Sequence, residues 1–167
     1  MTEVRDGEWM VGDAGTVTFW VRDDALVFED VRANPGWSAN IVRQLPHLLE
    51  IDLHSGTHEW EFSARYENGV LRVEIEEEVE PAGPGRYQVG DAGEVEIAVD
   101  HAGLKLVEVA TAPGWRMRVD EETSKEIEID FSAGAESWEF EAERNKRGEI
   151  EIEIEYEIEG RFAAQQK

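Results

Sequence analysis

The chain contains no cysteine, and it contains no apolar stretch long enough to cross a lipid bilayer. Without cysteine the protein has no disulfide framework, no thiolate metal site and no cysteine nucleophile. The segment from Met1 to Gly15 also lacks a basic stretch followed by an apolar run, which is the pattern of a secretory signal. We therefore expect a cytoplasmic protein without a membrane partner, and a mature secreted form is the alternative.

Basic residues are scarce: 16 Lys and Arg stand against 39 Asp and Glu, and the formal net charge is -23 at pH 7. Such an excess disfavours nucleic acid and anionic membranes as direct partners, and it favours cations and basic proteins. Hydrophobic residues make up 41% of the 167 residues and recur regularly within the acidic stretches, so the charge does not mark a disordered tail. The composition suits one or two compact domains.

No residue pattern indicates an active site, a metal site or a cofactor. His47 and His101 are isolated from any Ser that would complete a hydrolytic triad. His54 and His58 flank a turn, but the strand alternation places His54 outward and His58 inward beside Trp60, which argues against a metal pair. We therefore predict that the protein is not an enzyme and has no catalytic residue, metal ligand or cofactor.

Three short strings occur twice in the chain at a constant distance. They are VGDAG, beginning at Val11 and Val89; PGW, ending at Trp37 and Trp115; and WEF, beginning at Trp60 and Trp138. The members of each pair lie 78 residues apart, and one extra residue in the loop 146–148 is the single gap in the alignment. The sequence therefore predicts a tandem duplication.

Apolar and polar residues alternate in both copies, which is typical of strands with one buried face. Six such strands per copy are joined by tight turns, so neighbouring strands are expected to be antiparallel. The third strand is expected to bury Trp37, Ala39 and Ile41 in copy one, and Trp115, Met117 and Val119 in copy two. A slip in the alternation near Val31 and Val109 predicts a β-bulge at the end of the second strand.

We therefore predict an all-β protein made of two six-stranded antiparallel modules, each a small sandwich or barrel. Copy one spans residues 1–80, copy two spans 85–160, residues 81–84 form a linker marked by Pro and Gly, and 161–167 form a tail. The alternative is one continuous twelve-stranded barrel or sheet. Tight turns at Asp23-Asp24, Ser55-Gly56 and Asn68-Gly69 are expected to set the strand register.

Carboxylates gather on the outward face of the last three strands of each copy. The expected rows are Glu50, Glu61 and Glu76 in copy one, with Glu128, Glu139 and Glu155, and Glu126, Glu141 and Glu153, in copy two. Adjacent strands lie about 4.8 Å apart, and directly opposed like charges cost on the order of 1 kcal/mol per pair in water. Because these rows are tolerated, this face is the candidate functional surface.

Three interpretations of the acidic face compete. It is a solvated surface that keeps the protein soluble, a docking surface for a basic protein, or a site for Ca²⁺. Mimicry of a nucleic-acid backbone is a special form of the second. The third is the weakest, because Ca²⁺ favours convergent oxygens that often include backbone carbonyls, whereas a flat sheet face offers only side chains.

Trp20 lies on the outward phase between Phe19 and Val21, whereas copy two has Ala98 at the equivalent position. An outward Trp in one copy predicts a contact with the sister module, a homodimer interface or a ligand groove. We predict a non-enzymatic binding protein whose acidic face engages a basic protein. The alternative is a Ca²⁺-binding or carrier-type structural β protein, and the oligomeric state is not indicated.

Overall fold

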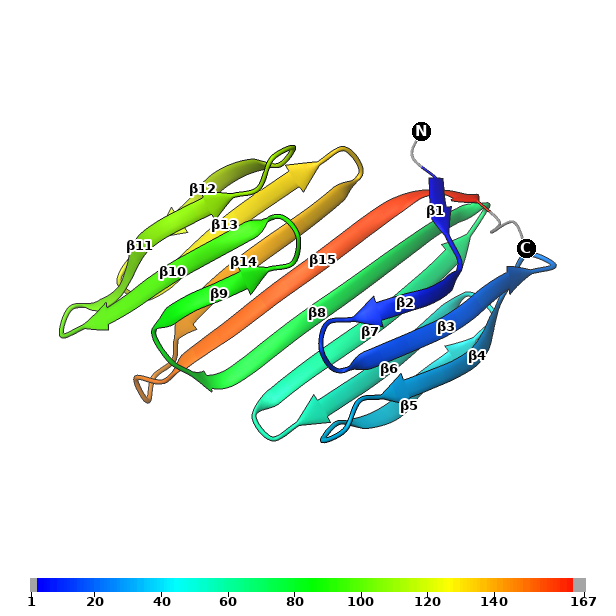
Figure 1. The fold of residues 1–167 in the computed structure, drawn as a ribbon, viewed down its shortest axis with the longest axis horizontal. Helices are drawn as coiled ribbons and strands as arrows, with labels where there is room; N and C mark the ends of the chain where they lie inside the picture. Colours follow the sequence, from blue (N-terminus) through cyan, green and yellow to red (C-terminus); the bar gives the residue numbers. More distant parts are fainter. Residues whose placement is uncertain (1–2, 164–167) are drawn as a thin grey trace. The chain divides into compact units, whose positions relative to one another are not determined.

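The computed structural model describes residues 3–163, and it is all-β as the alternation predicted. The described residues contain fifteen strands and no helix, and thus no helix that would cross a membrane (Figure 1). The strands are β1 (Glu3–Arg5), β2 (Gly7–Val11), β3 (Gly15–Arg22), β4 (Ala25–Ala33), β5 (Ser38–Leu45), β6 (Leu48–Ser55), β7 (His58–Glu67), β8 (Val70–Ala82), β9 (Gly85–Val89), β10 (Gly93–Asp100), β11 (Gly103–Thr111), β12 (Arg116–Glu122), β13 (Glu126–Ala133), β14 (Glu136–Arg144) and β15 (Ile150–Ala163).

The strands form three sheets. A nine-stranded sheet has the order β12-β13-β14-β15-β8-β7-β6-β5, with β1 added in parallel to β15. Two three-stranded antiparallel sheets have the orders β2-β3-β4 and β11-β10-β9. Within residues 3–163 the strands form neither a closed barrel nor a single sheet, so the twelve-stranded alternative is wrong.

The chain divides into two compact units. Unit 1 comprises the residues up to Glu76 together with those from Glu157 onward, and unit 2 comprises Glu77–Tyr156. The long strands β8 and β15 each give one half to either unit. Strand β8 also continues through Ala82, into the segment expected to be a linker, and β15 continues to Ala163, past the start of the expected tail.

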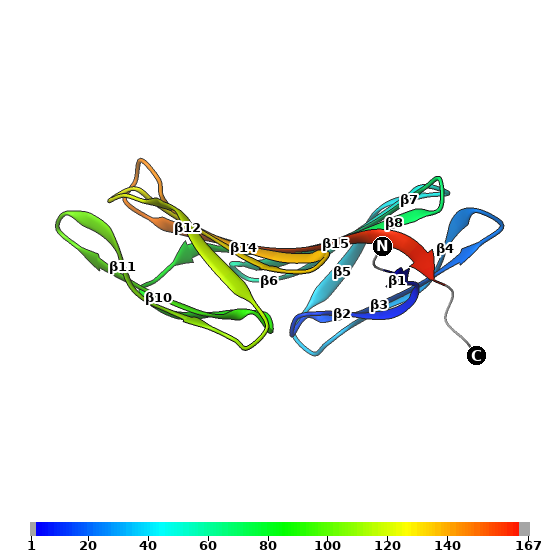
Figure 2. The ribbon, with the colours of Figure 1, turned by 90° about the horizontal axis from the view of Figure 1, so that it is seen from above.

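Each unit has two layers (Figure 2). In unit 1 the inward side chains of β3 meet those of β6 and β7, and the rings of Phe19 and Phe62 lie 6.0 Å apart. Both phenylalanines are fully buried, and burial of such a side chain is worth roughly 2 kcal/mol. In unit 2 the rings of Tyr87 and Phe140 likewise lie 6.0 Å apart, above a core that includes Ile129. Alternation therefore directs one face of each sheet into a packed core.

Each unit contains a strand that the sequence analysis missed. Strands β2 and β9 pair with β3 and β10, so each copy has a seventh strand, and copy one also contains the short β1 as an eighth. Both segments are short, and in β2 only Trp9 and Val11 mark the buried phase, which gives too little alternation to distinguish a strand from a loop. Strands β3, β4, β6 and β7 begin 78 residues before β10, β11, β13 and β14, respectively, in agreement with the repeat seen in the sequence.

The repeated VGDAG and WEF strings meet in space. In unit 1 the indole Nε1 of Trp60 donates a hydrogen bond to Oδ1 of Asp13 at 3.2 Å, and in unit 2 Trp138 donates to Asp91 at the same distance. The glycine before each aspartate lies under the indole ring, and a β-carbon on Gly12 would come within 2.1 Å of Trp60. The strings thus have a structural role, because they fasten the first turn of each unit to β7 or β14.

The third expected strand of each copy is not buried. Every residue of β5 and β12 is exposed, and Ile41 and Met117 are 43% and 40% accessible. The prediction that Ala39, Ile41, Met117 and Val119 enter the core is therefore wrong, and Trp37 and Trp115, just before these strands, are only half-buried. Both strands end the order of the nine-stranded sheet, so each pairs along one edge only, and alternation alone does not reveal whether a second layer covers it.

Two local predictions about turns and bulges are confirmed. Asp23 and Asp24 both have positive φ and form the turn that pairs Val21 with Leu26. Bulges interrupt β4 and β11 at Glu29 and Val107, two residues before the positions expected from the alternation.

Candidate functional site

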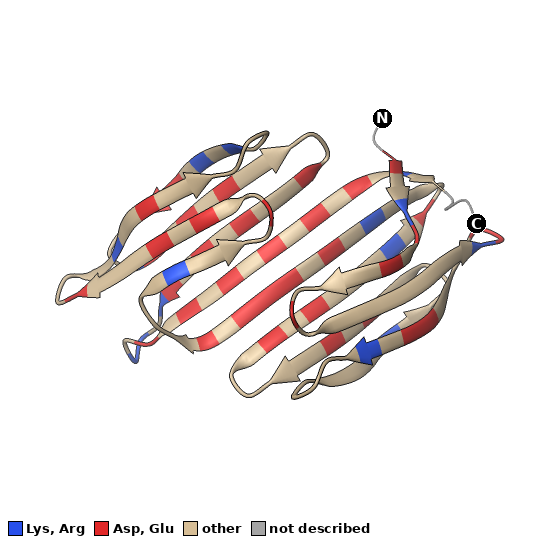
Figure 3. Ribbon diagram, viewed as in Figure 1, with Lys and Arg blue, Asp and Glu red and all other residues tan. Residues whose placement is uncertain are grey.

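The acidic face lies on the outward side of β6, β7 and β8 and of β13, β14 and β15. In these strands buried apolar residues alternate with half-buried or exposed residues, and most of the latter are Asp or Glu. Figure 3 shows the acidic residues recurring at alternate positions along β15, whereas on β8 they include one continuous stretch, Glu76–Glu78. The face is thus a direct product of the two-residue period of a strand.

In unit 2 the acidic pairs differ from the expected ones by two residues. Glu128 lies opposite Glu141, and Glu126 lies opposite Glu143. Glu139, expected beside Glu128, instead faces Asp130. The predicted rows Glu128–Glu139 and Glu126–Glu141 are therefore wrong, although all these residues share the outward face.

The same correction applies in unit 1. Asp52 lies opposite Glu61, and Glu50 lies opposite Ser63, so the predicted Glu50–Glu61 row is wrong. The cause is the position of the turn, which is Gly56-Thr57 and not Ser55-Gly56. Gly56 has φ +59, and the two-residue hairpin loops of types I′ and II′ have positive φ at their first central position, which glycine adopts readily. Moving the turn by one residue moves each cross-strand partner by two, which retains the face and changes the pairs.

The third members of the expected rows lie on the long strands. Glu76 is half-buried on β8, and Glu153 and Glu155 are half-buried at outward positions of β15. All three share the outward phase predicted for them.

Repulsion on this face is strongest around Glu141. Partial burial, together with the charges of Glu126, Glu128, Glu139 and Glu143, raises the pKa of Glu141 to about 7. Both partial burial and nearby negative charge disfavour the ionised carboxylate. At neutral pH this side chain is therefore close to its midpoint of protonation, which is unusual for a glutamate on a sheet surface.

A second acidic group lies beside Asp130. Partial burial, followed by its hydrogen bond with Asp120, raises the pKa of Asp130 to about 6. Asp120 is the extra residue of a bulge in β12, and its carboxylate also lies 2.6 Å from the guanidinium of Arg118. The bulge could not be read from the alternation, so the sequence analysis missed Asp120 as a member of this face.

In unit 1 the opposed carboxylates of Asp52 and Glu61 show the same effect to a smaller degree. Burial raises the pKa of both side chains, and the negative charges of neighbouring carboxylates act in the same direction. In both units partial burial is the largest cause of the raised pKa values, and the charges of nearby carboxylates add to it.

Few cations neutralise the face. Arg118 pairs with Asp120 and Asp130, and Arg72 pairs with Glu157 at 3.1 Å. Within residues 3–163, by contrast, the structure gives the cluster Glu126, Glu128, Glu141 and Glu143 no ion pair with a Lys or Arg side chain. We call these four residues the unpaired cluster.

Two sets of three carboxylates on β12 and β13 of unit 2 have oxygens close enough to share a cation. The oxygens of Asp120, Glu128 and Asp130 lie within 4.8 Å of one another, as do those of Glu121, Glu126 and Glu128. Arg118 already occupies the first set, so the second is the better candidate for a metal ion. Neither set includes a backbone carbonyl, which Ca²⁺ sites often use.

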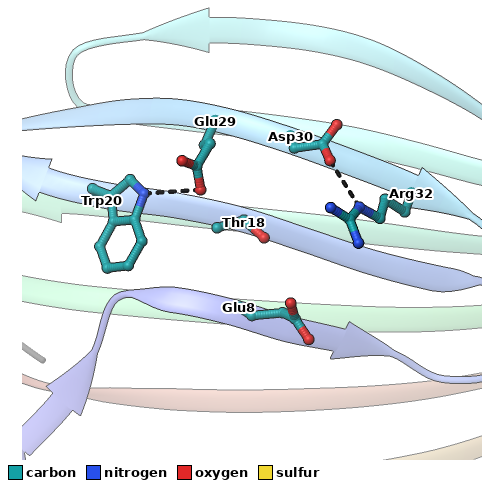
Figure 4. A pocket seen from close by; sticks show the side chains of 6 residues that line it. All are labelled: Glu8, Thr18, Trp20, Glu29, Asp30 and Arg32. Carbon is teal, nitrogen blue, oxygen red and sulfur yellow. Dashed lines mark hydrogen bonds and ion pairs between the residues drawn. The ribbon is translucent and has the colours of Figure 1, made fainter. Parts of the chain in front are cut away.

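Trp20 lines a shallow groove on the outer face of the sheet β2-β3-β4. The other lining residues are Glu8, Thr18, Glu29, Asp30 and Arg32 (Figure 4). The indole Nε1 of Trp20 donates a hydrogen bond to Oε2 of Glu29 at 3.1 Å. The outward placement of Trp20 is confirmed, but the sequence analysis did not identify the carboxylates around it, because the bulge at Glu29 changes the phase of β4.

His54 and His58 lie on opposite faces, as expected. His54 is exposed, whereas the His58 ring lies 5.3 Å from the ring of Trp37 and 6.3 Å from that of Trp60. His58 is thus part of an aromatic cluster at the first residue of β7.

No family model, curated protein or solved structure matches the chain.

Proposed function

We propose that the chain is a non-enzymatic interaction protein whose acidic sheet face binds a basic protein. The observation that carries this proposal is the unpaired cluster, in which Glu128 and Glu141 face each other without a basic side chain between them. Cationic side chains of a partner would relieve the repulsion and hold Glu141 in its ionised form. Complementary charge of this kind accelerates association and selects the partner.

The geometry of the face suits a regular array of basic side chains. Opposed carboxylates are about 5 Å apart across the strands and about 6.7 Å apart along them. A partner that presents Lys or Arg at similar spacing on a strand or helix would contact several carboxylates at once. A protein that otherwise binds nucleic acid is one such partner, and the acidic face would then compete with nucleic acid for it.

The first prediction concerns removal of the cluster's charge. A variant with Glu126→Gln, Glu128→Gln and Glu141→Gln is expected to bind a lysine-rich probe peptide about tenfold more weakly than the wild type, because the three carboxylates that would pair with its lysines are lost. The expected difference shrinks as NaCl is raised from about 0.05 to 0.5 M. Biolayer interferometry with the immobilised protein measures both effects.

A charge-matched control separates the cluster from net charge. Glu3→Gln, Asp23→Asn and Glu67→Gln also remove three negative charges, from exposed positions outside the cluster. This control is expected to bind about as well as the wild type. Equal losses in the two variants would show that only the total charge matters, and the docking proposal would then be abandoned. A lysate pull-down with the same variants would identify proteins retained by the wild type and the control but lost by the cluster variant.

The second candidate function is Ca²⁺ binding, and the observation that favours it is the set Glu121, Glu126 and Glu128. If these carboxylates hold Ca²⁺, about 5 mM CaCl₂ is expected to raise the melting temperature by several degrees relative to EDTA, because a ligand that binds only the folded chain stabilises it. MgCl₂ at equal ionic strength is the control for screening, since Mg²⁺ requires a stricter octahedral geometry. Equal shifts with the two salts would count against a Ca²⁺ site.

A further inference from the structure

The outer face of the sheet β2-β3-β4 in unit 1 differs sharply from the same face in unit 2. In unit 1, Glu8, Thr18 and Asp30 lie opposite one another across the three strands. The residues 78 positions later are Arg86, Glu96 and Glu108, which form the same row across β9, β10 and β11. The two units therefore present corresponding rows that differ at all three positions, and the arginine of the unit 2 row is replaced by a glutamate in unit 1.

In unit 2 this row contains its own guanidinium group. The guanidinium of Arg86 has Nη1 3.8 Å from Glu94, Nε 3.6 Å from Glu96 and Nη2 3.8 Å from Glu108. Each nitrogen thus faces a different carboxylate, which the planar guanidinium permits and a single ammonium does not. In unit 2 one arginine thus lies beside three carboxylates and offsets one of their three negative charges.

In unit 1 the arginine is absent and additional binding groups are present. Glu8 takes the place of Arg86, and Trp20 takes the place of Ala98. The bulge in β4 allows Glu29 and Asp30 to line the same groove although they are consecutive. Asp30 is paired with Arg32 at 3.0 Å, whereas Glu8 and Glu29 have no ion pair with a basic side chain in the described part of the chain (Figure 4).

The indole ring adds an attraction for cations. The guanidinium of Arg22 already lies 5.6 Å from the ring centroid of Trp20, so the ring holds a cation at this distance in the unbound chain. Such contacts are favourable at an exposed site and become stronger when water is excluded. The hydrogen bond to Glu29 also places a carboxylate at the edge of the ring.

Exposed apolar side chains flank the groove of unit 1 at two positions where unit 2 has polar residues. Met10 is 72% accessible and Val27 is 43% accessible, and the equivalent residues of unit 2 are Gln88 and Lys105. Both lie on the outward phase of the same sheet, Met10 opposite Thr16 and Val27 opposite Trp20. Apolar contacts beside a charged groove are typical of a surface that binds a peptide and not a free ion.

From these observations we infer that the groove binds an arginine side chain of a partner peptide. The guanidinium lies between the carboxylates of Glu8 and Glu29 and against Trp20, in the role that Arg86 fills in unit 2. Arginine is favoured over lysine because its planar group faces several carboxylates at once and stacks on an indole ring. The inference rests on the proposed function only in that the partner is basic, since the groove lies on the opposite sheet of unit 1 from the acidic face.

The test is an NMR titration of the complete chain with the peptide acetyl-Gly-Arg-Gly-amide. The probe signal is the indole N–H of Trp20, assigned by its loss in Trp20→Phe. Arginine peptide is expected to shift this signal in a saturable way, the lysine peptide is expected to bind several-fold more weakly, and the neutral citrulline peptide is expected to leave the signal unchanged. The indole signal of Trp138 in unit 2 serves as an internal reference.

Two variants retain the Trp20 signal and give opposite expectations. Glu8→Arg installs the residue found in unit 2, and it is expected to weaken arginine-peptide binding by at least about tenfold. Arg22→Ala removes a competing cation from the ring, and it is expected to strengthen binding about threefold. Both positions are exposed, and the dispersion of the spectrum confirms that each variant is folded.

An equal shift with the citrulline peptide, or undiminished binding by Glu8→Arg, would overturn the inference. The cluster variant of β13 and β14 keeps the groove intact, so it is expected to bind the arginine peptide as the wild type does. If that variant loses the lysine-rich probe but keeps the arginine peptide, the two sites are independent. Failure at the groove then leaves the proposed function standing, and failure at the cluster leaves the groove standing.

Discussion

Gly12→Ala is expected to lower the free energy of unfolding by about 3–4 kcal/mol. The added β-carbon would lie 2.1 Å from Cζ2 of Trp60, so the indole ring would have to move. Its movement would break the 3.2 Å hydrogen bond from Trp60 Nε1 to Asp13. Because Trp60 is buried, the displaced ring would also disturb the packing of unit 1. Urea denaturation followed by circular dichroism measures the loss.

The chain offers a matched control for backbone strain. Gly56 has φ +59, close to the φ +51 of Gly12, but a β-carbon there meets no atom within 4 Å. Gly56→Ala is therefore expected to cost only about 1 kcal/mol, from the left-handed conformation alone. The pair Gly90 and Gly134 repeats the comparison in unit 2, where Gly90 lies under Trp138. Similar losses from Gly12→Ala and Gly56→Ala would show that backbone strain dominates and that the Trp contact is unimportant.

The sequence predicted the features of this fold that depend on neighbouring residues. Alternation places Phe62 and Phe140 in the cores and Glu61 and Glu139 outward, because side chains of a strand point to opposite faces. The turn at Asp23-Asp24 also follows from local sequence, since both residues tolerate positive φ. Because alternation is a local property, it predicted the acidic face correctly, although it did not predict which carboxylates lie opposite each other.

The features that failed depend on longer distances or on one position in a turn. The acidic pairs changed because Gly56 occupies the first and not the second place in its hairpin loop. The exposure of β5 depends on whether another layer covers it, which the pattern around Ile41 does not contain. The Trp60–Asp13 hydrogen bond joins residues 47 positions apart. The repetition of the VGDAG and WEF strings shows that both are retained, but it does not show that one contacts the other.

The structure adds detail to the two surfaces that the sequence analysis identified, the acidic face and the surface around Trp20. The acidic face is not uniform, since Arg118 neutralises one end of it while the cluster around Glu141 has no such cation. Trp20 is not an isolated outward aromatic residue, since Glu8 and Glu29 accompany it in one groove. Both surfaces thus combine unneutralised carboxylates with a local feature that a cationic group would complete, and both favour a basic partner.

Acidification is expected to stabilise this protein, in contrast to most folded proteins. The pKa of Glu141 is about 7 in the folded chain and ordinarily 4.5. Between these values the folded chain binds more protons than the unfolded chain, so its stability increases as the pH falls through this range. Asp130, with a pKa of about 6, acts in the same direction. Allowing for solvent screening of partly exposed groups, we expect about 2 kcal/mol more stability at about pH 5 than at pH 8, or a rise of about 5 °C in melting temperature.

Glu141→Gln tests whether the cluster causes this dependence. The neutral amide cannot ionise, so the variant is expected to be about 1 kcal/mol more stable than the wild type at about pH 8 and nearly equal to it at pH 5. Glu67→Gln, at an exposed position of β7, is the matched control and is expected to leave the pH profile unchanged. Calorimetry from pH 5 to 8 measures all three proteins. A melting temperature that falls on acidification, or an unchanged slope in Glu141→Gln, would show that the cluster relaxes in solution; its repulsion would then be unable to drive the binding of a basic partner.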